Sequence, residues 1–257
     1  MSRKIKSFII LAFCLQFVVC ASSNKNIQQK REEDPRYQYN MGLFYLNNGN
    51  ADEAIKCFHK SLQKEPSSFL THNAMGLAYL MKHELEKSLQ YFKKTLQINP
   101  KFSEAHNYLG TVYQEMGMLD EAEKEYRFAI ADLEYKSKEL PYYNLARLSL
   151  LKEEREEALT YVDRALEYNK SLVMAYNLKG IILERMEKFE EAIESYKSGL
   201  KYAPDDMDLQ FNLAVAHFKN NEQDKAKNIF EKLALQSPDP EMKVKINEYL
   251  SLINRKN

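Results

Sequence analysis

Apolar side chains follow a helical pattern through most of this chain. They recur at spacings of three and four residues, in two stretches per 34 residues, with short polar segments between the stretches. This spacing places the apolar residues on one face of an α-helix. No β-rich segment is evident, so the pattern predicts pairs of amphipathic helices and an all-α fold.

A small residue returns at a fixed interval within this pattern. It stands at Gly42, Gly76, Gly110, Ala146, Gly180 and Ala214. In the first three copies a Tyr follows three positions later. A period of this length predicts a solenoid, in which each repeat is one helix pair that buries its apolar face against its neighbours. Such an architecture offers an extended binding surface rather than a reaction centre.

Six repeats keep the same phase from residue 35 to residue 240. We number them 1 to 6, and they cover residues 35–68, 69–102, 103–138, 139–172, 173–206 and 207–240. Repeat 3 carries two extra residues, because the interval from Gly110 to Ala146 is 36 rather than 34. We expect this insertion in the loop before repeat 4. Residues 241–254 place apolar side chains on one face, which predicts a closing helix that covers repeat 6.

Particular positions within each repeat have a physical role. Small residues at the eighth and twentieth positions, such as Gly42 and Ala54, should let the two helix backbones approach closely. An aromatic residue at position 24, such as Phe58, should fill the space between neighbouring helix pairs. Proline near position 32 ends the second helix. Gly49 and Gly117 lie between the two helices of their repeats, where a left-handed turn favours glycine.

The order of these positions resembles the tetratricopeptide repeat, whose signature has Leu-Gly, Tyr, Ala, Phe and Pro in this order. The resemblance covers residues 35–240. It implies a right-handed α-solenoid in which the first helix of each repeat lines a concave groove. Lys179 departs from the usual apolar seventh residue. The two-Lys, two-Asn clamp of chaperone-binding relatives is not matched, because Glu104 and Tyr108 stand at two of its positions.

The amino terminus has the features of a targeting segment. Arg3, Lys4 and Lys6 precede an apolar run from Phe8 to Val19. This run is too short to span a bilayer comfortably and has the length of the apolar part of a signal peptide. Residues 1–19 are therefore predicted to be the signal peptide of a bacterial envelope protein.

Two processing outcomes fit the end of this segment. In the first, Cys20 is lipidated, because Cys20 followed by Ala21 resembles a bacterial lipobox, with Val19 in place of the usual small residue. In the second, a signal peptidase cuts after Ala21 and releases a soluble periplasmic protein. We predict lipidation, with residues 20–34 as lipid anchor and flexible tether. This places the protein on the periplasmic face of the outer membrane.

Composition and charge exclude some partners. The chain has 37 basic and 37 acidic residues, so its net charge is zero. Removal of residues 1–19 takes away three basic residues and leaves 34 against 37, a charge of −3. A basic stripe that could follow phosphates is not indicated, so nucleic acid is not an expected partner. Cys57 is the one thiol of the mature body besides Cys20, which excludes an intramolecular disulfide, and we expect Cys57 in the core.

The sequence has no recognisable catalytic motif. It lacks a phosphate loop, a dinucleotide fingerprint, His-Glu-x-x-His and a nucleophile elbow. His72 and His106 share the fourth position of adjacent repeats, but Tyr142 and Tyr176 stand there in the next two repeats. We therefore expect both histidines to be structural. The predictions are no enzymatic activity, no cofactor, no metal and no small-molecule substrate.

The tetratricopeptide resemblance implies a protein or peptide ligand in the groove. Every repeat has an Asn at its fifth or sixth position, whose amide could pair with the backbone of an extended peptide or satisfy local backbone groups. Apolar residues beside these amides favour an amphipathic or hydrophobic segment as ligand. The predicted groove residues are Tyr39, Asn40, Leu43, Asn73, Leu77, Leu80, Asn107, Tyr143, Asn144, Asn177, Ile181, Phe211, Asn212 and Val215.

The chain resembles the type IV pilus biogenesis and stability lipoproteins, the pilotins, in three features. These are the predicted lipid anchor at Cys20, the six repeats and the inserted segment. The run from Asp132 through Tyr135 to Tyr142 and Tyr143 is similar to that family's interrupted junction between the third and fourth repeats. The resemblance implies that this protein helps the secretin subunit to reach the outer membrane and assemble there. The alternative is a general periplasmic scaffold for another envelope complex, such as a cell-wall or outer-membrane assembly machine.

Overall fold

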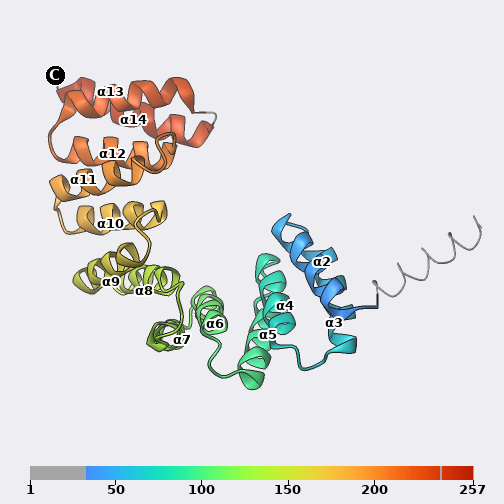
Figure 1. The fold of residues 1–257 in the computed structure, drawn as a ribbon. Coiled ribbons are helices and arrows are strands. Elements are labelled where there is room, and N and C mark those ends of the chain that lie inside the picture. Colours follow the sequence, from blue (N-terminus) through green and yellow to red (C-terminus); the bar gives the residue numbers. More distant parts are fainter. Residues whose placement is uncertain (1–32, 238, 257) are drawn as a thin grey trace, which may run out of the picture. The chain divides into compact units, whose positions relative to one another are not determined.

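The structure is a computed structural model that describes residues 33–237 and 239–256. These residues form thirteen α-helices and no strand, which confirms the predicted all-α repeat solenoid (Figure 1). The predicted signal peptide, the lipidation site Cys20 and all but the last two residues of the tether lie outside the described residues.

The helices fall two to each predicted repeat. The pairs are α2 Pro35–Asn47 with α3 Ala51–Lys64, α4 Phe69–Met81 with α5 Leu85–Ile98, α6 Ser103–Glu115 with α7 Leu119–Ala131, α8 Glu139–Leu151 with α9 Arg155–Tyr168, α10 Val173–Arg185 with α11 Phe189–Leu200, and α12 Met207–Lys219 with α13 Gln223–Gln236. A last helix, α14, covers Pro240–Lys256. It begins one residue before the predicted closing helix and ends two residues after it.

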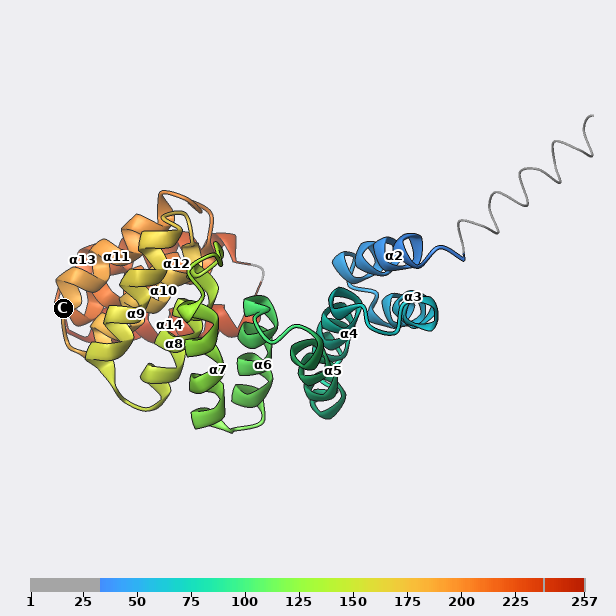
Figure 2. The same ribbon diagram turned by 60° about the horizontal axis from the view of Figure 1, so that its bottom comes forward.

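Two compact halves divide the chain between Met116 and Gly117. The N-terminal half contains α2 to α6, and the C-terminal half contains α7 to α14. Within the C-terminal half, α10, α11 and α12 lie side by side, as the turned view in Figure 2 shows. Each half has its own apolar core. Phe58 and Met75 are fully buried in the first half, and Leu183 and Phe230 have at most 1% of their surface exposed in the second.

The turn between the two helices of a repeat has left-handed backbone geometry. Gly49 and Gly117 both have φ near +76°, as predicted. The same position in the other four repeats is occupied by a residue with a side chain, at φ between 55° and 62°. These residues are His83, Glu153, Glu187 and Asn221. The backbone therefore turns in the same way whether or not glycine is present.

The glycine at the eighth position has a more specific role than we predicted. We expected it to let two helix backbones approach. In the structure, a Cβ on Gly42 would lie 2.3 Å from the ring of Phe58, and a Cβ on Gly76 would lie 2.7 Å from the ring of Phe92. Each ring comes from position 24 of the same repeat. The glycine therefore makes room for the aromatic ring of its own helix pair.

Two other details follow from the helix bounds. The loop of residues 132–138 between α7 and α8 has seven residues, against four in the loop of residues 65–68, so the insertion lies between repeats. Leu133 in this loop is 93% exposed. Cys57 on α3 is half-buried rather than in the core, so that expectation was wrong, and burial raises the pKa of its thiol.

Candidate protein-binding surfaces

The first helices of the repeats form one face in each half. In the C-terminal half, α10 contacts both α8 and α12, and in the N-terminal half, α4 contacts both α2 and α6. We call these two surfaces the first-helix faces. All fourteen residues of the predicted groove belong to first helices.

A cleft of about 300 Å³ lies on the first-helix face of the C-terminal half. We call it the C-terminal cleft. It brings together four predicted groove residues, and α14 adds a side chain that we had assigned only to covering repeat 6. The lining residues are Ile181, Glu184, Arg185, Phe211, Asn212, Val215, Lys219 and Tyr249.

The apolar wall of the C-terminal cleft is a packed aromatic cluster. Phe211 contacts the rings of Phe230 and Tyr249, with centroids 5.7 and 6.0 Å away. Tyr249 stacks on Phe230 at 5.1 Å and meets Phe218 edge-on at 5.3 Å. Val215 is only 8% exposed. Because these rings hold one another, the wall is formed before any ligand binds.

The charged groups of the C-terminal cleft are already paired. Glu184 accepts hydrogen bonds from Lys219 at 2.7 Å and from the hydroxyl of Tyr196 at 2.6 Å. Burial, together with the charge of Glu184, raises the pKa of Tyr196. Arg185 lies 3.3 Å from Glu153 of the preceding repeat. A ligand in this cleft therefore meets an apolar wall and a rim of compensated charges, which suits an amphipathic segment.

The asparagines do not form a uniform row. Asn212 donates a hydrogen bond to the side-chain oxygen of Asn177 at 2.8 Å, so these two amides pair with each other. Asn73 and Asn107 are buried, with 5% and 3% exposed, whereas Asn40 is exposed. The exposed amide of Asn40 can therefore form hydrogen bonds with the backbone of a peptide, whereas the buried amides of Asn73 and Asn107 cannot.

The remaining predicted groove residues are half-buried. In the N-terminal half, Tyr39, Leu43 and Leu77 pack against the core cluster around Phe58, and Leu80 is half-buried on α4. In the C-terminal half, two further predicted groove residues are half-buried on α8, Tyr143 and Asn144. Half-buried apolar side chains keep part of their surface available, so both first-helix faces offer apolar area.

The fourth position holds the loop between repeats in place. His72 Nε2 lies 2.9 Å from the carbonyl oxygen of Pro66, and His106 Nε2 lies 3.1 Å from that of Pro100. Other side chains make the same bond to the carbonyl six residues earlier in repeats 5 and 6. Tyr176 donates to Lys170, and Gln210 donates to Pro204. The histidines are therefore structural, and the described residues contain no cluster of three or more His, Cys, Asp or Glu side chains that could hold a metal ion.

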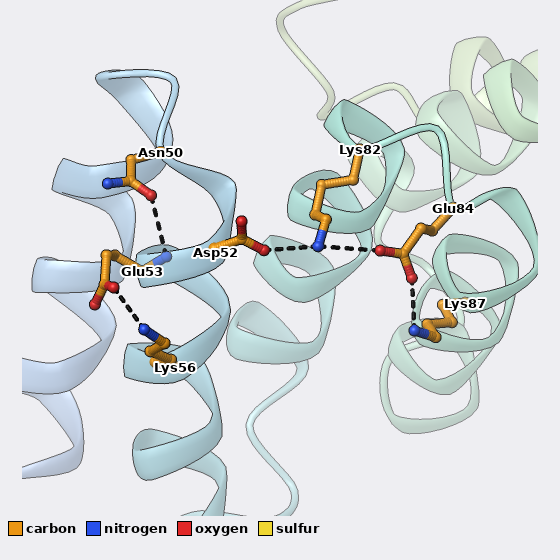
Figure 3. Close-up of polar contacts among 7 residues, drawn as sticks. All are labelled: Asn50, Asp52, Glu53, Lys56, Lys82, Glu84 and Lys87. Atoms are coloured by element: carbon orange, nitrogen blue, oxygen red, sulfur yellow. Dashed lines mark hydrogen bonds and ion pairs between the residues drawn. The ribbon is translucent and has the colours of Figure 1, made fainter.

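Ion pairs between neighbouring repeats were not predicted. Lys82 at position 14 of repeat 2 lies between Asp52 of repeat 1, at 2.6 Å, and Glu84, at 3.1 Å (Figure 3). Lys152 holds the same position in repeat 4 and pairs with Asp120 and Glu123 of repeat 3, which raises its pKa to about 12. The sequence feature that could have predicted these ion pairs is an Asp at position 18 of one repeat with a Lys 30 or 32 residues later, in the next repeat. This feature can be recognised only when the repeat phase is known.

A second hollow of about 410 Å³ lies beside α10 and α11, lined by Tyr176, Lys179 and three exposed glutamates. Lys179 is already paired with Asp163 at 2.7 Å. Solvated carboxylates at a helix start need no ligand. In the described part of the chain, no helix has both the length and the apolar character needed to cross a bilayer.

Comparison with known proteins agrees with the repeat pattern. Models described as tetratricopeptide repeat match residues 35–68 and 91–124, and a model of the tetratricopeptide repeat protein 21 C-terminal ARM domain matches residues 130–248. A TPR repeat-containing protein of Methanocaldococcus jannaschii, MJ1428, is 31% identical over 96 residues. That match covers 37% of this chain and 17% of the relative. A peptide N-acetylglucosaminyltransferase of Giardia intestinalis matches over 65 residues, only 4% of that enzyme.

Two solved structures with the same fold each cover more than four fifths of this chain. PilF of Pseudomonas aeruginosa has a TM-score of 0.74 at 19% identity, and covers 85% of this chain and 99% of its own. PilW, described as a widely conserved type IV pilus biogenesis factor, has a TM-score of 0.77 at 15% identity, with 82% and 98% covered. At these identities the likeness shows the fold alone. The chain therefore contains segments that match tetratricopeptide-repeat models, and its fold is similar to those of PilF and PilW.

Proposed function

We propose that this protein is a non-enzymatic scaffold that binds a segment of another protein on its first-helix faces. The observation that carries the proposal is the C-terminal cleft, with a preformed aromatic wall next to paired charges. Tetratricopeptide-repeat proteins bind protein or peptide partners, and an amphipathic segment fits this combination of surfaces. Its apolar side chains would contact Ile181 and Phe211.

More specifically, we propose a type IV pilus biogenesis lipoprotein that helps the secretin subunit to reach the outer membrane and to assemble. Support comes from the fold, which is similar to that of PilW, and from Cys20 at the end of the predicted signal peptide. A lipid on Cys20 would hold the repeats at the periplasmic face of the outer membrane. The first-helix faces would then cover a hydrophobic segment of the secretin and limit its aggregation during transit.

The alternative is a scaffold for another envelope complex, engaged in cell-wall or outer-membrane assembly. The same cleft supports it, because apolar and paired charged groups do not by themselves select a secretin. The two functions differ in the partner and in the phenotype that follows deletion of the gene.

Deletion and complementation separate these functions. The amount of denaturation-resistant secretin multimer in outer membranes is measured after deletion of the gene, and after complementation with wild type or with Cys20→Ala. Loss of multimers that only the wild type restores would support the pilus function and the anchor together. Unchanged multimers and normal pili would exclude the secretin role and leave the general scaffold.

A further inference from the structure

The first helix of a repeat packs on the second helix of the preceding repeat. Helix α4 contacts α3, α6 contacts α5, α8 contacts α7, α10 contacts α9, and α12 contacts α11. Side chains at the third, seventh and tenth positions of the repeat lie in the buried clusters at these contacts, as Leu209, Leu213 and Ala216 of α12 do beside α11. At the tenth position of repeats 2 to 6, at most 1% of the side-chain surface is exposed. These residues are Ala78, Val112, Leu148, Ile182 and Ala216.

Helix α2 has large apolar residues at the same three positions, and two of them are exposed. They are Tyr37, Met41 and Phe44, which we call the α2 outer face. Their spacing of four and three residues places them on one side of the helix. Tyr37 is 39% exposed, Phe44 is 58% exposed, and Met41 is half-buried. The end of a repeat stack normally carries polar side chains, so apolar residues at these packing positions indicate a face that another helix covers.

A second copy of this chain fits the α2 outer face. The three side chains are spaced almost symmetrically about Met41. Two α2 helices that cross antiparallel at Met41 therefore bring Tyr37 of each copy next to Phe44 of the other. Aromatic pairs of this kind stabilise an interface beyond the apolar area that they bury. A surface that matches itself in this way is suited to a two-fold interface.

The charges beside the face agree with the antiparallel arrangement. The α2 outer face itself has no charged residue. Exposed Arg36 near the start of one helix would lie near the end of the other helix, where the helix dipole favours a cation. A parallel pair would instead bring the two Arg36 side chains together. Residues 22–34, which precede α2, are a poor alternative cover, because Ile27 is their only aliphatic residue.

We propose that two copies of this protein pair through their α2 outer faces, about a two-fold axis at Met41. The pairing uses none of the predicted groove residues and none of the residues that line the C-terminal cleft, so it does not depend on the proposed function. One helix pair buries less area than the roughly 1,200–2,000 Å² of a stable interface, so the dimer is weak and reversible.

Disulfide crosslinking of the full-length protein in detergent tests this pairing, because it captures a weak dimer. Cys14, Cys20 and Cys57 are replaced by serine, so that one introduced cysteine is the single thiol. On oxidation, Met41→Cys should form a disulfide-linked dimer about tenfold faster than Leu252→Cys, because thiols bridge only when their Cα atoms come within about 7 Å. Leu252 is the matched control, since it is an apolar side chain of α14 that is 46% exposed.

Further variants test the geometry of the pair. A mixture of Tyr37→Cys and Phe44→Cys proteins should give more mixed dimer than either protein alone gives of its own dimer. Phe44→Lys should reduce the Met41→Cys dimer about tenfold, whereas Leu252→Lys should leave it unchanged. Both lysines replace exposed side chains, so both proteins should keep their helical circular dichroism.

Three results would overturn the pairing and leave the scaffold function standing. The first is a Met41→Cys dimer that forms no faster than that of Leu252→Cys, and the second is a dimer that Phe44→Lys leaves unchanged. The third is lipid contact. If no dimer forms and Phe44→Lys lowers binding of the protein to vesicles of phosphatidylethanolamine and phosphatidylglycerol, the α2 outer face meets a membrane rather than a second copy.

Discussion

Single residues in left-handed turns show how the repeat tolerates variation. The fifteenth position of each repeat needs positive φ, which costs an ordinary L-residue about 1–2 kcal/mol and glycine very little. Repeats 1 and 3 have glycine there, whereas Glu187 in repeat 5 adopts φ of 59°. The turn geometry is therefore set by the helix pair, and sequence reasoning could identify it only where glycine was present.

Replacement of Glu187 by glycine should stabilise the protein. Relief of the left-handed strain exceeds the added freedom of the unfolded chain, so the free energy of unfolding should rise by about 0.5–1 kcal/mol. Urea denaturation measures this change. The control is Glu190→Gly in the first turn of α11, where glycine should instead destabilise by up to about 1 kcal/mol. A loss of stability in E187G would show that the side chain has a role we have not identified.

Addition of a methyl group at Gly76 should destabilise the protein. Its added Cβ would meet the ring of Phe92 at 2.7 Å, so Gly76→Ala should lower the free energy of unfolding by about 1–2 kcal/mol. Repeat 6 combines Ala214 with Phe230, which keeps the expected cost moderate. The double variant Gly76→Ala, Phe92→Leu should lose less than the sum of the single changes, as measured in a double-mutant cycle. Additive losses would contradict a direct contact.

Glu104 should reduce the stability of the unliganded protein. Its folded-state pKa is raised by burial, so the folded protein binds the proton more tightly than the unfolded chain does. Stability therefore falls as pH rises from the unfolded pKa through the raised one. Glu104→Gln should raise the melting temperature at pH 7, and this gain should shrink as pH is lowered through the acidic range. An equal gain at every pH would show that ionisation of Glu104 is not the cause.

At the scale of helices, the sequence pattern predicted most of the fold. The 34-residue period located both helices of every repeat and placed the insertion in the loop of residues 132–138. Period and amphipathicity are local properties, so they can be read from one sequence. The division into halves after Met116 was not predictable, because it depends on how tightly successive helix pairs contact one another.

The closing helix has a second role that the sequence did not show. Tyr249 of α14 stacks on Phe230 and also lines the C-terminal cleft. Its aromatic ring was recognisable as part of the apolar face of the helix, but its contact with Phe211 depends on the crossing of α14 over repeat 6. The helix therefore stabilises repeat 6 and shapes the cleft with the same side chain.

Removal of this ring should affect stability strongly. Tyr249→Ala deletes a half-buried ring that contacts three other aromatic rings, so the free energy of unfolding should fall by about 2–3 kcal/mol. Leu252→Ala on the same helix is the matched control, since that side chain is 46% exposed and should cost under about 0.5 kcal/mol. Chemical denaturation compares the two. Similar losses would contradict the role of the aromatic cluster.

For the whole molecule, the proposed binding chemistry is clearest in the C-terminal half. The C-terminal cleft offers an apolar wall with compensated charges. The sequence pattern named Ile181, Phe211, Asn212 and Val215, which the structure brings together, because the repeat phase fixes the face of a helix. It did not name Glu184 or Tyr249 as groove residues, because their place in the cleft depends on how several helices pack together. The groove as a whole remains a prediction.

Site-specific photocrosslinking in living cells tests the central claim, protein binding on the first-helix faces, most directly. A photoreactive amino acid replaces Lys219 at the rim of the C-terminal cleft or, as control, the exposed Lys232 of α13. The account predicts a discrete adduct from position 219 that is absent at position 232. The adduct should disappear when Ile181→Lys blocks the cleft, while the variant stays folded by circular dichroism. Equal adducts from both positions, or an adduct at 219 that is unaffected by Ile181→Lys, would contradict it.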